Sequence, residues 1–223
     1  MLKIFIIVPV YNEGNRSLET IKNVLKNSKC RVIVIDDGST DGTYKKLNKA
    51  FGKNDRVMVL RHIINLGKGA AMKTGAEMVW KLGGEAVIFL DADGQHNPKH
   101  LKKFEKELER HKIVFGYREM DKNMPLVRKW GNIMASNLVK TLFNIKKKDL
   151  LSGYLGFRKE VYEKIKWSSC RYGIETEMAT KIGRKRLAFA EIKVDTTYID
   201  KYKGVTLVDA MKILLKIPYW YFN

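Results

Sequence analysis

At Val87-Ile88-Phe89-Leu90-Asp91-Ala92-Asp93-Gly94-Gln95-His96, an apolar run stops abruptly at two carboxylates one residue apart. The apolar residues predict a central buried strand, and the acidic tripeptide then falls on the loop at its carboxyl end, where open α/β sheets bind ligands. Asp91, Asp93 and the amide oxygen of Gln95 are hard oxygen donors suited to Mg²⁺ or Mn²⁺, which could hold a diphosphate. For the tripeptide alone, an Asx-turn that caps the next helix is the competing interpretation.

Apolar runs alternate with segments of helical spacing from residue 2 to residue 115. This alternation predicts an α/β fold with a mostly parallel sheet flanked by helices. Strands are expected at Leu2–Val8, Arg31–Ile35, Val57–Leu60, Ala86–Leu90 and Ile113–Phe115, and helices at Ser17–Asn27, Tyr44–Ala50, about 70–82 and Pro98–Arg110. The carboxyl ends of parallel strands meet at one edge, which should bring together Glu13, Asp36, Asp37, Lys68, Asp91 and Asp93.

The second half of the chain keeps less of this alternation. Helical spacing occurs at Pro125–Lys140, from Lys159, at Ile174–Ile182 and at Leu207–Tyr221, with a strand or hairpin at Ala188–Tyr198. No internal repeat or low-complexity linker interrupts the chain. We therefore expect one domain over residues 1–206 and a C-terminal amphipathic helix over residues 207–223.

Positive charge is concentrated in the second half. The 223 residues carry a formal net charge of +19, and residues 99–223 hold 28 Lys and Arg against 14 Asp and Glu. Such an excess favours a polyanionic partner, such as a phosphorylated substrate or an anionic membrane surface. Because no basic patch has the spacing of a nucleic-acid-binding motif, we expect no nucleic acid partner.

The C-terminal segment Leu207–Phe222 has apolar residues on most faces, two lysines and a terminal aromatic cluster. This composition is typical of a helix in a membrane interface, and a helix packed on the core or on a second copy is the alternative. The sequence has no run of about 18 apolar residues, so we expect no transmembrane helix. The start, Met1–Val8, ends at Pro9 without a small-residue cleavage site, which favours a first strand over a signal peptide. Two cysteines are too few for a disulfide framework, which predicts a reducing compartment.

Four motifs occur in one order: Val8-Pro9-Val10-Tyr11-Asn12-Glu13, Asp36-Asp37-Gly38-Ser39-Thr40-Asp41-Gly42-Thr43, Asn65-Leu66-Gly67-Lys68-Gly69 and Asp91-Ala92-Asp93-Gly94-Gln95-His96-Asn97-Pro98. With them the chain resembles the family-two glycosyltransferases of the GT-A fold, a single Rossmann-like α/β domain. The resemblance continues at Gly116-Tyr117-Arg118, Arg128 with Gly131-Asn132, Asp149–Tyr154, Glu175–Met178 and Lys201–Thr206. The most similar branch is that of the dolichol-phosphate mannose and glucose synthases, which load a sugar from a nucleotide onto a polyprenyl phosphate.

The resemblance implies a donor site at the ends of the first, second and fourth strands. Carboxylates there would accept hydrogen bonds from the base and ribose, and a tyrosine would offer its apolar face to the base. The ammonium of Lys68, between two glycines before a helix, would lie near the diphosphate. The implied donor-binding residues are Pro9, Tyr11, Glu13, Asp36, Asp37, Lys68, Asp91, Ala92 and Lys201, and the implied metal ligands are Asp91, Asp93 and Gln95.

The same resemblance implies that Arg118 and Arg128 bind the acceptor phosphate, because guanidinium grips phosphate bidentately. Glu175 and Glu177 lie two residues apart, so one could face the site and the other solvent. Family analogy puts at least one of them near the reacting sugar, and we assign Glu177 to the catalytic set with Asp91, Asp93, Arg118 and Arg128.

One position departs from the family pattern. Leu155 follows Ser152-Gly153-Tyr154 where related sequences usually carry an arginine, and Arg158 comes three residues later. A role for that arginine therefore cannot be transferred, and the donor sugar is left open.

We expect a metal-dependent, inverting glycosyltransferase that uses Mg²⁺ or Mn²⁺ to move a hexose from a GDP- or UDP-linked sugar to a polyprenyl or dolichyl phosphate. It would be attached peripherally to the cytoplasmic face of the cell membrane. A phosphate acceptor needs no general base, whereas a hydroxyl acceptor, in a surface polysaccharide or lipid-linked glycan, would need Glu175, Glu177 or Asp149. A nucleotide-sugar-binding module without turnover is an alternative of another class. Nucleotidyl transfer would typically need a glycine-rich loop after the first strand, which Pro9–Gly14 is not.

Overall fold

The computed structural model describes residues 1–118, 141–143, 145, 147–149, 152–170 and 173–195. Strands and helices alternate over the first half of the chain, and the second half adds shorter elements. In order these are β1 (Ile4–Val10), α1 (Gly14–Asn27), β2 (Arg31–Asp36), α2 (Thr43–Phe51), β3 (Val57–Arg61), α3 (Lys68–Lys81), β4 (Ala86–Phe89), the 3₁₀ turn η1 (Pro98–His100), α4 (Leu101–Leu108), β5 (Ile113–Tyr117), β6 (Leu155–Arg158), α6 (Lys159–Ile165), α7 (Ile174–Arg184) and β7 (Ala190–Lys193).

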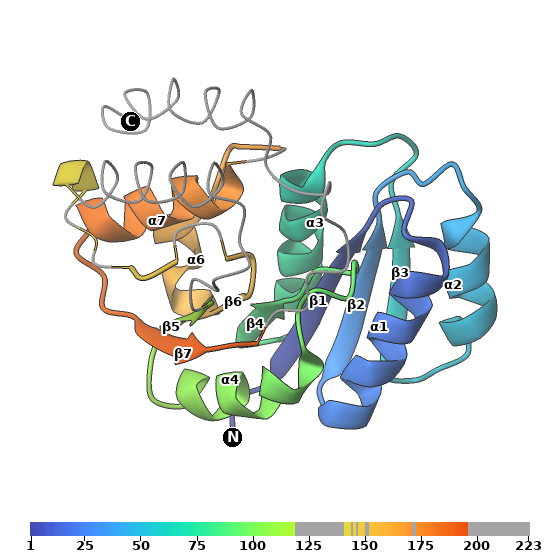
Figure 1. Cartoon of the computed structure of the whole chain (residues 1–223), viewed down its shortest axis with the longest axis horizontal. Helices are drawn as coiled ribbons and strands as arrows, with labels where there is room; N and C mark the ends of the chain where they lie inside the picture. Colours follow the sequence, from blue (N-terminus) through green and yellow to red (C-terminus); the bar gives the residue numbers. More distant parts are fainter. Residues whose placement is uncertain (119–140, 144, 146, 150–151, 171–172, 196–223) are drawn as a thin grey trace.

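The seven strands form one mixed sheet in the order β3-β2-β1-β4-β6-β5-β7 (Figure 1). The pairs β2–β3, β1–β2, β1–β4 and β5–β7 are parallel, whereas β6 runs antiparallel to both β4 and β5. The prediction of an α/β domain with a mostly parallel sheet flanked by helices is confirmed. Strand β6 was not predicted, because Gly156 in its middle and the aromatic residues around it break the apolar pattern.

Each face of the sheet has its own core, which is why the strands are apolar on both sides. Ile4, Ile6 and Val8 of β1 pack under α1, α2 and α4, while Phe5 and Ile7 pack under α3, α6 and α7 (Figure 1). Helices thus cover both faces of the sheet. Its carboxyl edge, with the loops after β1, β2, β3 and β4, is left for ligands.

The loops after β1 and β2 are joined by hydrogen bonds. The backbone N–H of Asn12 donates to Ser39 Oγ at 2.9 Å, and Asn12 Oδ1 accepts from the Thr40 N–H at 2.9 Å. Gly14 N–H donates to Thr43 Oγ1 at 2.8 Å. These bonds fix the shape of the edge next to Tyr11.

Two expected elements differ in extent, and two others lie outside the described residues. The helix predicted over Pro98–Arg110 is a 3₁₀ turn followed by α4, which ends at Leu108. The strand or hairpin predicted over Ala188–Tyr198 is β7, four residues paired with β5. The helices predicted at 125–140 and 207–221 lie outside the described residues, as does the boundary at residue 206. Within the described part of the chain, no helix has the length and apolar character needed to cross a bilayer.

Candidate active site

Three charged side chains meet beyond the carboxyl end of β4. Lys68 Nζ lies 2.7 Å from Asp91 Oδ1 and 2.8 Å from Glu175 Oε1. The three residues come from the start of α3, the loop after β4 and the first turn of α7. Their side chains remain 29%, 27% and 14% exposed, so a ligand can reach this charged cluster.

Lys68 and Asp91 each stabilise the charged form of the other. Burial alone would raise the pKa of Asp91, but the charges of Lys68, His96 and Arg118 and the hydrogen bond from Lys68 together hold this pKa below its usual value. Burial alone would lower the pKa of Lys68, but Asp91 and Glu175 together raise it above its usual value. This shift favours the charged form of Lys68, so an anionic ligand would meet a positive charge there.

Asp37 fixes the turn that precedes Lys68. Its Oδ1 accepts from the Leu66 N–H at 3.0 Å and lies 2.7 Å from His62 Nδ1, and its Oδ2 accepts from the Gly67 N–H at 2.7 Å. The residue is only 2% exposed. These three partners and this burial show that the Asp37 carboxylate shapes the turn, and its predicted contact with the nucleoside stays a prediction.

Glu177 fixes the segment around Ser168 and Ser169, on the other side of Lys68 from Asp37. Its carboxylate accepts from the backbone N–H groups of Ser168 at 2.8 Å and Ser169 at 2.9 Å, and Oε1 lies 2.9 Å from Lys181 Nζ. The residue is 0% exposed, so it faces neither solvent nor the cluster. Glu175, and not Glu177, is the carboxylate beside Lys68, and the assignment of Glu177 to the catalytic set stays a prediction.

The segment that Glu177 holds grips the first turn of α3. Gly69 N–H donates to the carbonyl of Cys170 at 2.7 Å, and Trp167 Nε1–H donates to the Gly69 carbonyl at 2.8 Å. A Cβ on Gly69 would lie 2.1 Å from the Ser169 carbonyl oxygen, so only glycine fits there. Two buried carboxylates, Asp37 and Glu177, thus position Lys68 from both sides.

Gly153 forms the floor of the cluster. A Cβ at this position would lie 2.8 Å from Lys68 Nζ, 3.0 Å from Asp91 Oδ2 and 3.3 Å from Glu175 Oε1. A side chain here would push the ammonium out of its place between the carboxylates. The sequence alone does not identify Gly153 as a neighbour of the cluster, because Lys68, Asp91 and Glu175 lie in distant segments of the chain.

We expect Gly153→Ala to lower about tenfold the sugar transfer that the sequence predicts, because displaced charges are misaligned by tenths of an ångström. The protein should stay folded, since the nearest atom is the mobile end of a lysine. Steady-state transfer rates and thermal unfolding of the variant and the wild type test this. The control is Ala50→Ser, at an exposed position of α2. Gly83→Ala would not serve, because Gly83 has a positive φ of 71° that strains alanine. Unchanged transfer by Gly153→Ala would contradict a role of the cluster in the reaction.

The acidic loop after β4 offers further oxygen donors. Asp93 Oδ1 accepts from the Gln95 N–H at 2.9 Å, which closes the Asx-turn considered above. His96 is buried, accepts from the Asp91 N–H through Nδ1 at 3.2 Å and stacks on Tyr154 with ring centroids 5.1 Å apart. The Thr20 hydroxyl donates to the carbonyl of Ala92 at 3.1 Å. These contacts fix the backbone of the loop.

A divalent cation fits the donor chemistry of this loop. In the described part of the chain no three His, Cys, Asp or Glu side chains are grouped to hold a metal alone. Mg²⁺ is commonly bound through one or two carboxylates together with substrate phosphates. Asp91, Asp93 and Gln95 lie on one loop and supply oxygen donors of this kind, so they would hold an ion whose coordination the diphosphate completes.

Arg118 lies at the end of β5 and forms a forked ion pair with Asp149. Its Nε is 2.6 Å from Asp149 Oδ2 and its Nη2 is 3.1 Å from Oδ1. Burial would raise the pKa of Asp149, but hydrogen bonds and charge from Arg118 lower it overall. Arg118 also helps to lower the pKa of Asp91.

Lys147 is a buried cation beside this pair. It is 1% exposed, and its Nζ lies 3.8 Å from the centre of the Phe115 ring. Burial lowers the pKa of Lys147 to about 8, although the nearby charges of Asp149 and Glu175 partly offset this effect. The folded chain therefore gives up this proton more readily than the unfolded chain does.

We expect Lys147→Met to raise the free energy of unfolding at pH 7 by about 2 kcal/mol, because it removes a buried charge without changing the volume much. In the wild type this free energy should rise between pH 8 and 10.5, where the unfolded chain binds the proton and the folded chain does not. The variant should lack this rise. Chemical denaturation at several pH values measures both, and lower stability of the variant at pH 7 would contradict the expectation.

The remaining predicted residues are distributed as follows. Tyr11 is 44% exposed next to buried Pro9, and Glu13 lies at the start of α1. Asp36 is 0% exposed; its Oδ2 accepts from the Ser39 N–H at 3.3 Å, and among the described residues its Oδ1 has no hydrogen-bond partner. Arg128 and Lys201 lie outside the described residues, so their roles stay predictions.

The fold and this edge define a class of protein. A parallel sheet whose first strands end in ligand loops, with an acidic loop after β4 and a lysine at the start of α3, is the architecture of a nucleotide-binding α/β enzyme. Comparison with known families makes the assignment specific. The chain belongs to glycosyl transferase family 2, whose model matches residues 5–166, and it is a glycosyltransferase.

Two relatives match almost the whole chain. The UDP-N-acetylglucosamine–dolichyl-phosphate N-acetylglucosaminyltransferase of Methanococcus voltae is 27% identical over 96% of this chain and 94% of its own length. The polyprenol monophosphomannose synthase of Mycolicibacterium smegmatis is 26% identical over 96% of this chain and 85% of its own length. The predicted resemblance to polyprenyl-phosphate glycosyltransferases is thereby confirmed.

The fold also matches solved structures. Glucosyl-3-phosphoglycerate synthase from Mycobacterium tuberculosis, crystallised with Mn²⁺, UDP and phosphoglyceric acid, superposes with a TM-score of 0.75 over 99% of this chain and 78% of that one. At 16% identity this likeness shows a shared GT-A fold.

Proposed function

We propose that this glycosyltransferase moves a hexose from a UDP- or GDP-linked sugar to the phosphate of a polyprenyl lipid, with inversion at the anomeric carbon. The observation that carries the proposal is the partly exposed Lys68–Asp91–Glu175 cluster at the carboxyl edge of the sheet. Family membership and the names of the two relatives support the choice of a nucleotide sugar and a lipid phosphate.

The donor end is built by charges that face a diphosphate. Lys68 would stabilise the negative charge that grows on the leaving diphosphate, because its ammonium is held in place before the reaction begins. Tyr11, exposed beside the loop after β2, would offer its ring to the base. Asp36 Oδ1, which has no hydrogen-bond partner among the described residues, lies in the same region and could accept from the nucleoside.

A divalent ion would be held by Asp91, Asp93 and Gln95. When bound, Mg²⁺ or Mn²⁺ supplies charge neutralisation for the diphosphate. The contribution of the chain is to keep Asp91 ionised through Lys68 and to fix Asp93 through the turn to Gln95.

The acceptor end contains Arg118. Its guanidinium uses Nε and Nη2 on Asp149, which orients the group toward a phosphate while balancing its charge. An acceptor phosphate is already anionic, so its oxygen attacks the anomeric carbon on the face opposite the diphosphate without a general base. We also propose the cytoplasmic membrane face as the place of the reaction, where nucleotide sugars and lipid phosphates meet.

One observation favours a second acceptor class. Glu175 is a partly exposed carboxylate at the reacting edge, where it could take a proton from a sugar or alcohol hydroxyl. Its ion pair with Lys68 at 2.8 Å engages Oε1, so a hydroxyl acceptor would use Oε2. The comparison of Glu175→Gln with Glu177→Gln in the Discussion separates the two classes.

Thermal unfolding with nucleoside diphosphates tests the donor and metal parts of the proposal. We expect UDP or GDP to stabilise the full chain when Mn²⁺ is present and not when it is absent. A ligand at 100 times its Kd adds about 2.7 kcal/mol of stability. Asp93→Ala should abolish the shift, whereas equal shifts without metal or in Asp93→Ala would contradict the site.

A further inference from the structure

The connection between β3 and α3 presents a group of apolar side chains to solvent. Ile63 is 96% exposed, Ile64 65% and Leu66 44%. Single exposed apolar residues are common on folded proteins, whereas a contiguous group marks an interaction surface. We call residues 63–66 the docking loop.

The backbone of the docking loop is held by hydrogen bonds at both ends, so its apolar side chains are exposed in an ordered conformation. The His62 N–H donates to the carbonyl of Asp36 at 2.8 Å at one end, and Asp37 accepts from Leu66 and Gly67 at the other. Gly38 lies so close that a Cβ there would come within 2.4 Å of the Ile64 carbonyl carbon. The backbone is braced on the sheet while the isoleucine side chains project away from it.

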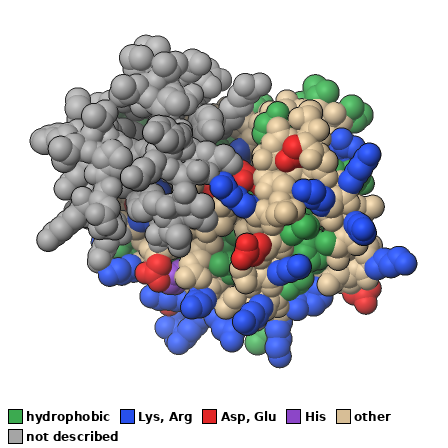
Figure 2. Space-filling model, turned by 45° about the vertical axis from the view of Figure 1, so that its right-hand side comes forward, with side chains coloured by type: hydrophobic (Ala, Val, Ile, Leu, Met, Phe, Trp, Pro, Cys, Tyr) green, Lys and Arg blue, Asp and Glu red, His purple; other side chains and the backbone are tan. Residues whose placement is uncertain are grey.

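The docking loop lies at the ligand edge. In Figure 1 the connection from β3 to α3 runs over the top of the sheet, at the end to which β1 and β2 also lead. Figure 2 shows hydrophobic side chains at the upper edge of the described face with Lys and Arg side chains beside them. Lys68 follows the docking loop directly, which links this surface to the charged cluster.

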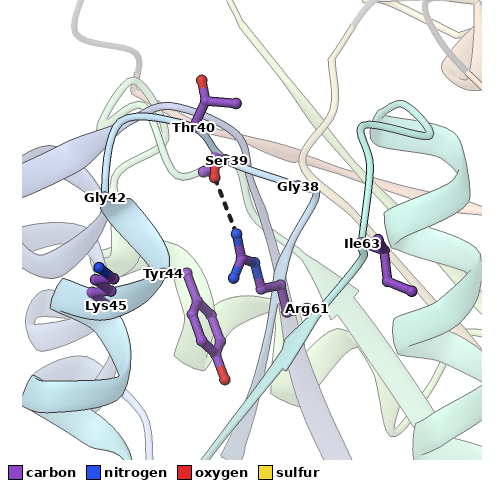
Figure 3. Close-up of a pocket in the computed structure, with 8 residues that line it drawn as sticks. All are labelled: Gly38, Ser39, Thr40, Gly42, Tyr44, Lys45, Arg61 and Ile63. Carbon is purple, nitrogen blue, oxygen red and sulfur yellow. Dashed lines mark hydrogen bonds between the residues drawn. The ribbon is translucent and has the colours of Figure 1, made fainter.

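A basic pocket of about 360 Å³ opens beside Ile63 (Figure 3). The Arg61 guanidinium lies 4.7 Å over the Tyr44 ring and 3.5 Å from the Ser39 carbonyl oxygen. Its Nε lies 3.5 Å from Asp36 Oδ2, and the Arg61 side chain stays 46% exposed, so it can still meet a phosphate. Lys45 lies at the same pocket, on α2. Apolar side chains next to two cations suit the interface of an anionic bilayer. The apolar side chains would enter the acyl layer while the cations contact lipid phosphates.

We propose that the docking loop inserts Ile63 and Ile64 into the interface of an anionic bilayer, with Arg61 and Lys45 contacting lipid phosphates. The inference rests on the proposed function in one respect, since a lipid-linked acceptor would reach the charged cluster from a bilayer lying along this edge. The charge complementarity of the pocket and the apolar loop selects a membrane rather than a protein as the occupant.

Co-sedimentation of the full chain with vesicles tests the proposal. Vesicles of phosphatidylglycerol and phosphatidylcholine should bind the wild type, and Ile63→Ser combined with Ile64→Ser should lower the partition coefficient about tenfold or more. Lys45→Gln should weaken binding to these vesicles and leave binding to pure phosphatidylcholine unchanged. Leu142→Ser, at a leucine 42% exposed elsewhere on the chain, is the matched control and should bind as the wild type does.

Equal sedimentation of the double variant and the wild type would overturn the proposal. So would sedimentation velocity without vesicles, if the wild type self-associates and the double variant does not, because the loop would then join two copies. The thermal shift with UDP or GDP and Mn²⁺ is measured without lipid, so failure of the proposed function appears there and failure of membrane docking appears only with vesicles.

Discussion

Asp91→Asn is expected to lower the rate of sugar transfer by a factor on the order of 10² to 10³, the usual effect of removing one preorganised charge from a reacting centre. Asparagine has nearly the same shape as aspartate but lacks the charge that faces Lys68 at 2.7 Å. It would also be a weaker ligand for a divalent ion. Because the side chain is 27% exposed, losing the ion pair should change the free energy of unfolding by only about 1 kcal/mol.

The measurement is transfer from UDP- and GDP-linked sugars to a lipid extract, alongside thermal unfolding. Asp55→Asn is the matched control, because Asp55 is exposed in the turn before β3, at the opposite edge of the sheet, and should transfer at the wild-type rate. A loss smaller than about tenfold in Asp91→Asn, with the fold intact, would remove Asp91 from the reacting centre.

The position of the charged edge could be predicted because its causes are local. A buried strand that ends at Phe89, just before buried Leu90, forces the next carboxylate onto a loop, and parallel strands bring their carboxyl ends together. The same reasoning applies to Lys68, which follows a turn and begins a helix. Strand composition and chain order were therefore sufficient to place Lys68 and Asp91 on one edge, although not to show that they touch.

The partners of each carboxylate could not be predicted, because they depend on contacts between distant segments. Asp37 and Asp36 are neighbours in the sequence, yet Asp37 is saturated by a turn about 30 residues later and Asp36 keeps one oxygen without a partner in the described chain. Strand β6 escaped prediction for a related reason. Its antiparallel place between β4 and β5 is set by the sheet and not by its own four residues.

Glu175 and Glu177 show most clearly what residue spacing in the sequence cannot predict. Residues two apart on a helix point about 200° away from each other, so they cannot share one target. The expectation that one faces the site was reasonable, but the other does not face solvent. It is buried, where it organises the segment that contacts the first turn of α3.

We expect Glu177→Gln to lower the free energy of unfolding by about 3 kcal/mol, because an amide would leave at least one buried donor unpaired and Lys181 without its counter-charge. Burial raises the pKa of Glu177, but hydrogen bonds from Ser169 and Ser168 lower it below 4.5 overall. The advantage of the wild type over Glu177→Gln should therefore be complete at neutral pH and shrink as the pH falls below 4.5, where the unfolded chain takes up its proton first. Denaturant unfolding at pH 7 and pH 4 measures both effects.

Glu175→Gln is the matched variant on the same helix turn, and it should keep the fold because its side chain is 14% exposed at the cluster. If the acceptor is a phosphate, it should transfer within about tenfold of the wild type, whereas a hydroxyl acceptor would lose a factor on the order of 10² to 10⁴ with its general base. Both rates are compared at a temperature at which Glu177→Gln is still folded, so that a modest loss of activity there reports misplacement of Lys68 and not unfolding. A fully stable Glu177→Gln with a transfer rate reduced a thousandfold would place Glu177 in the reacting centre and contradict the structural role argued for it.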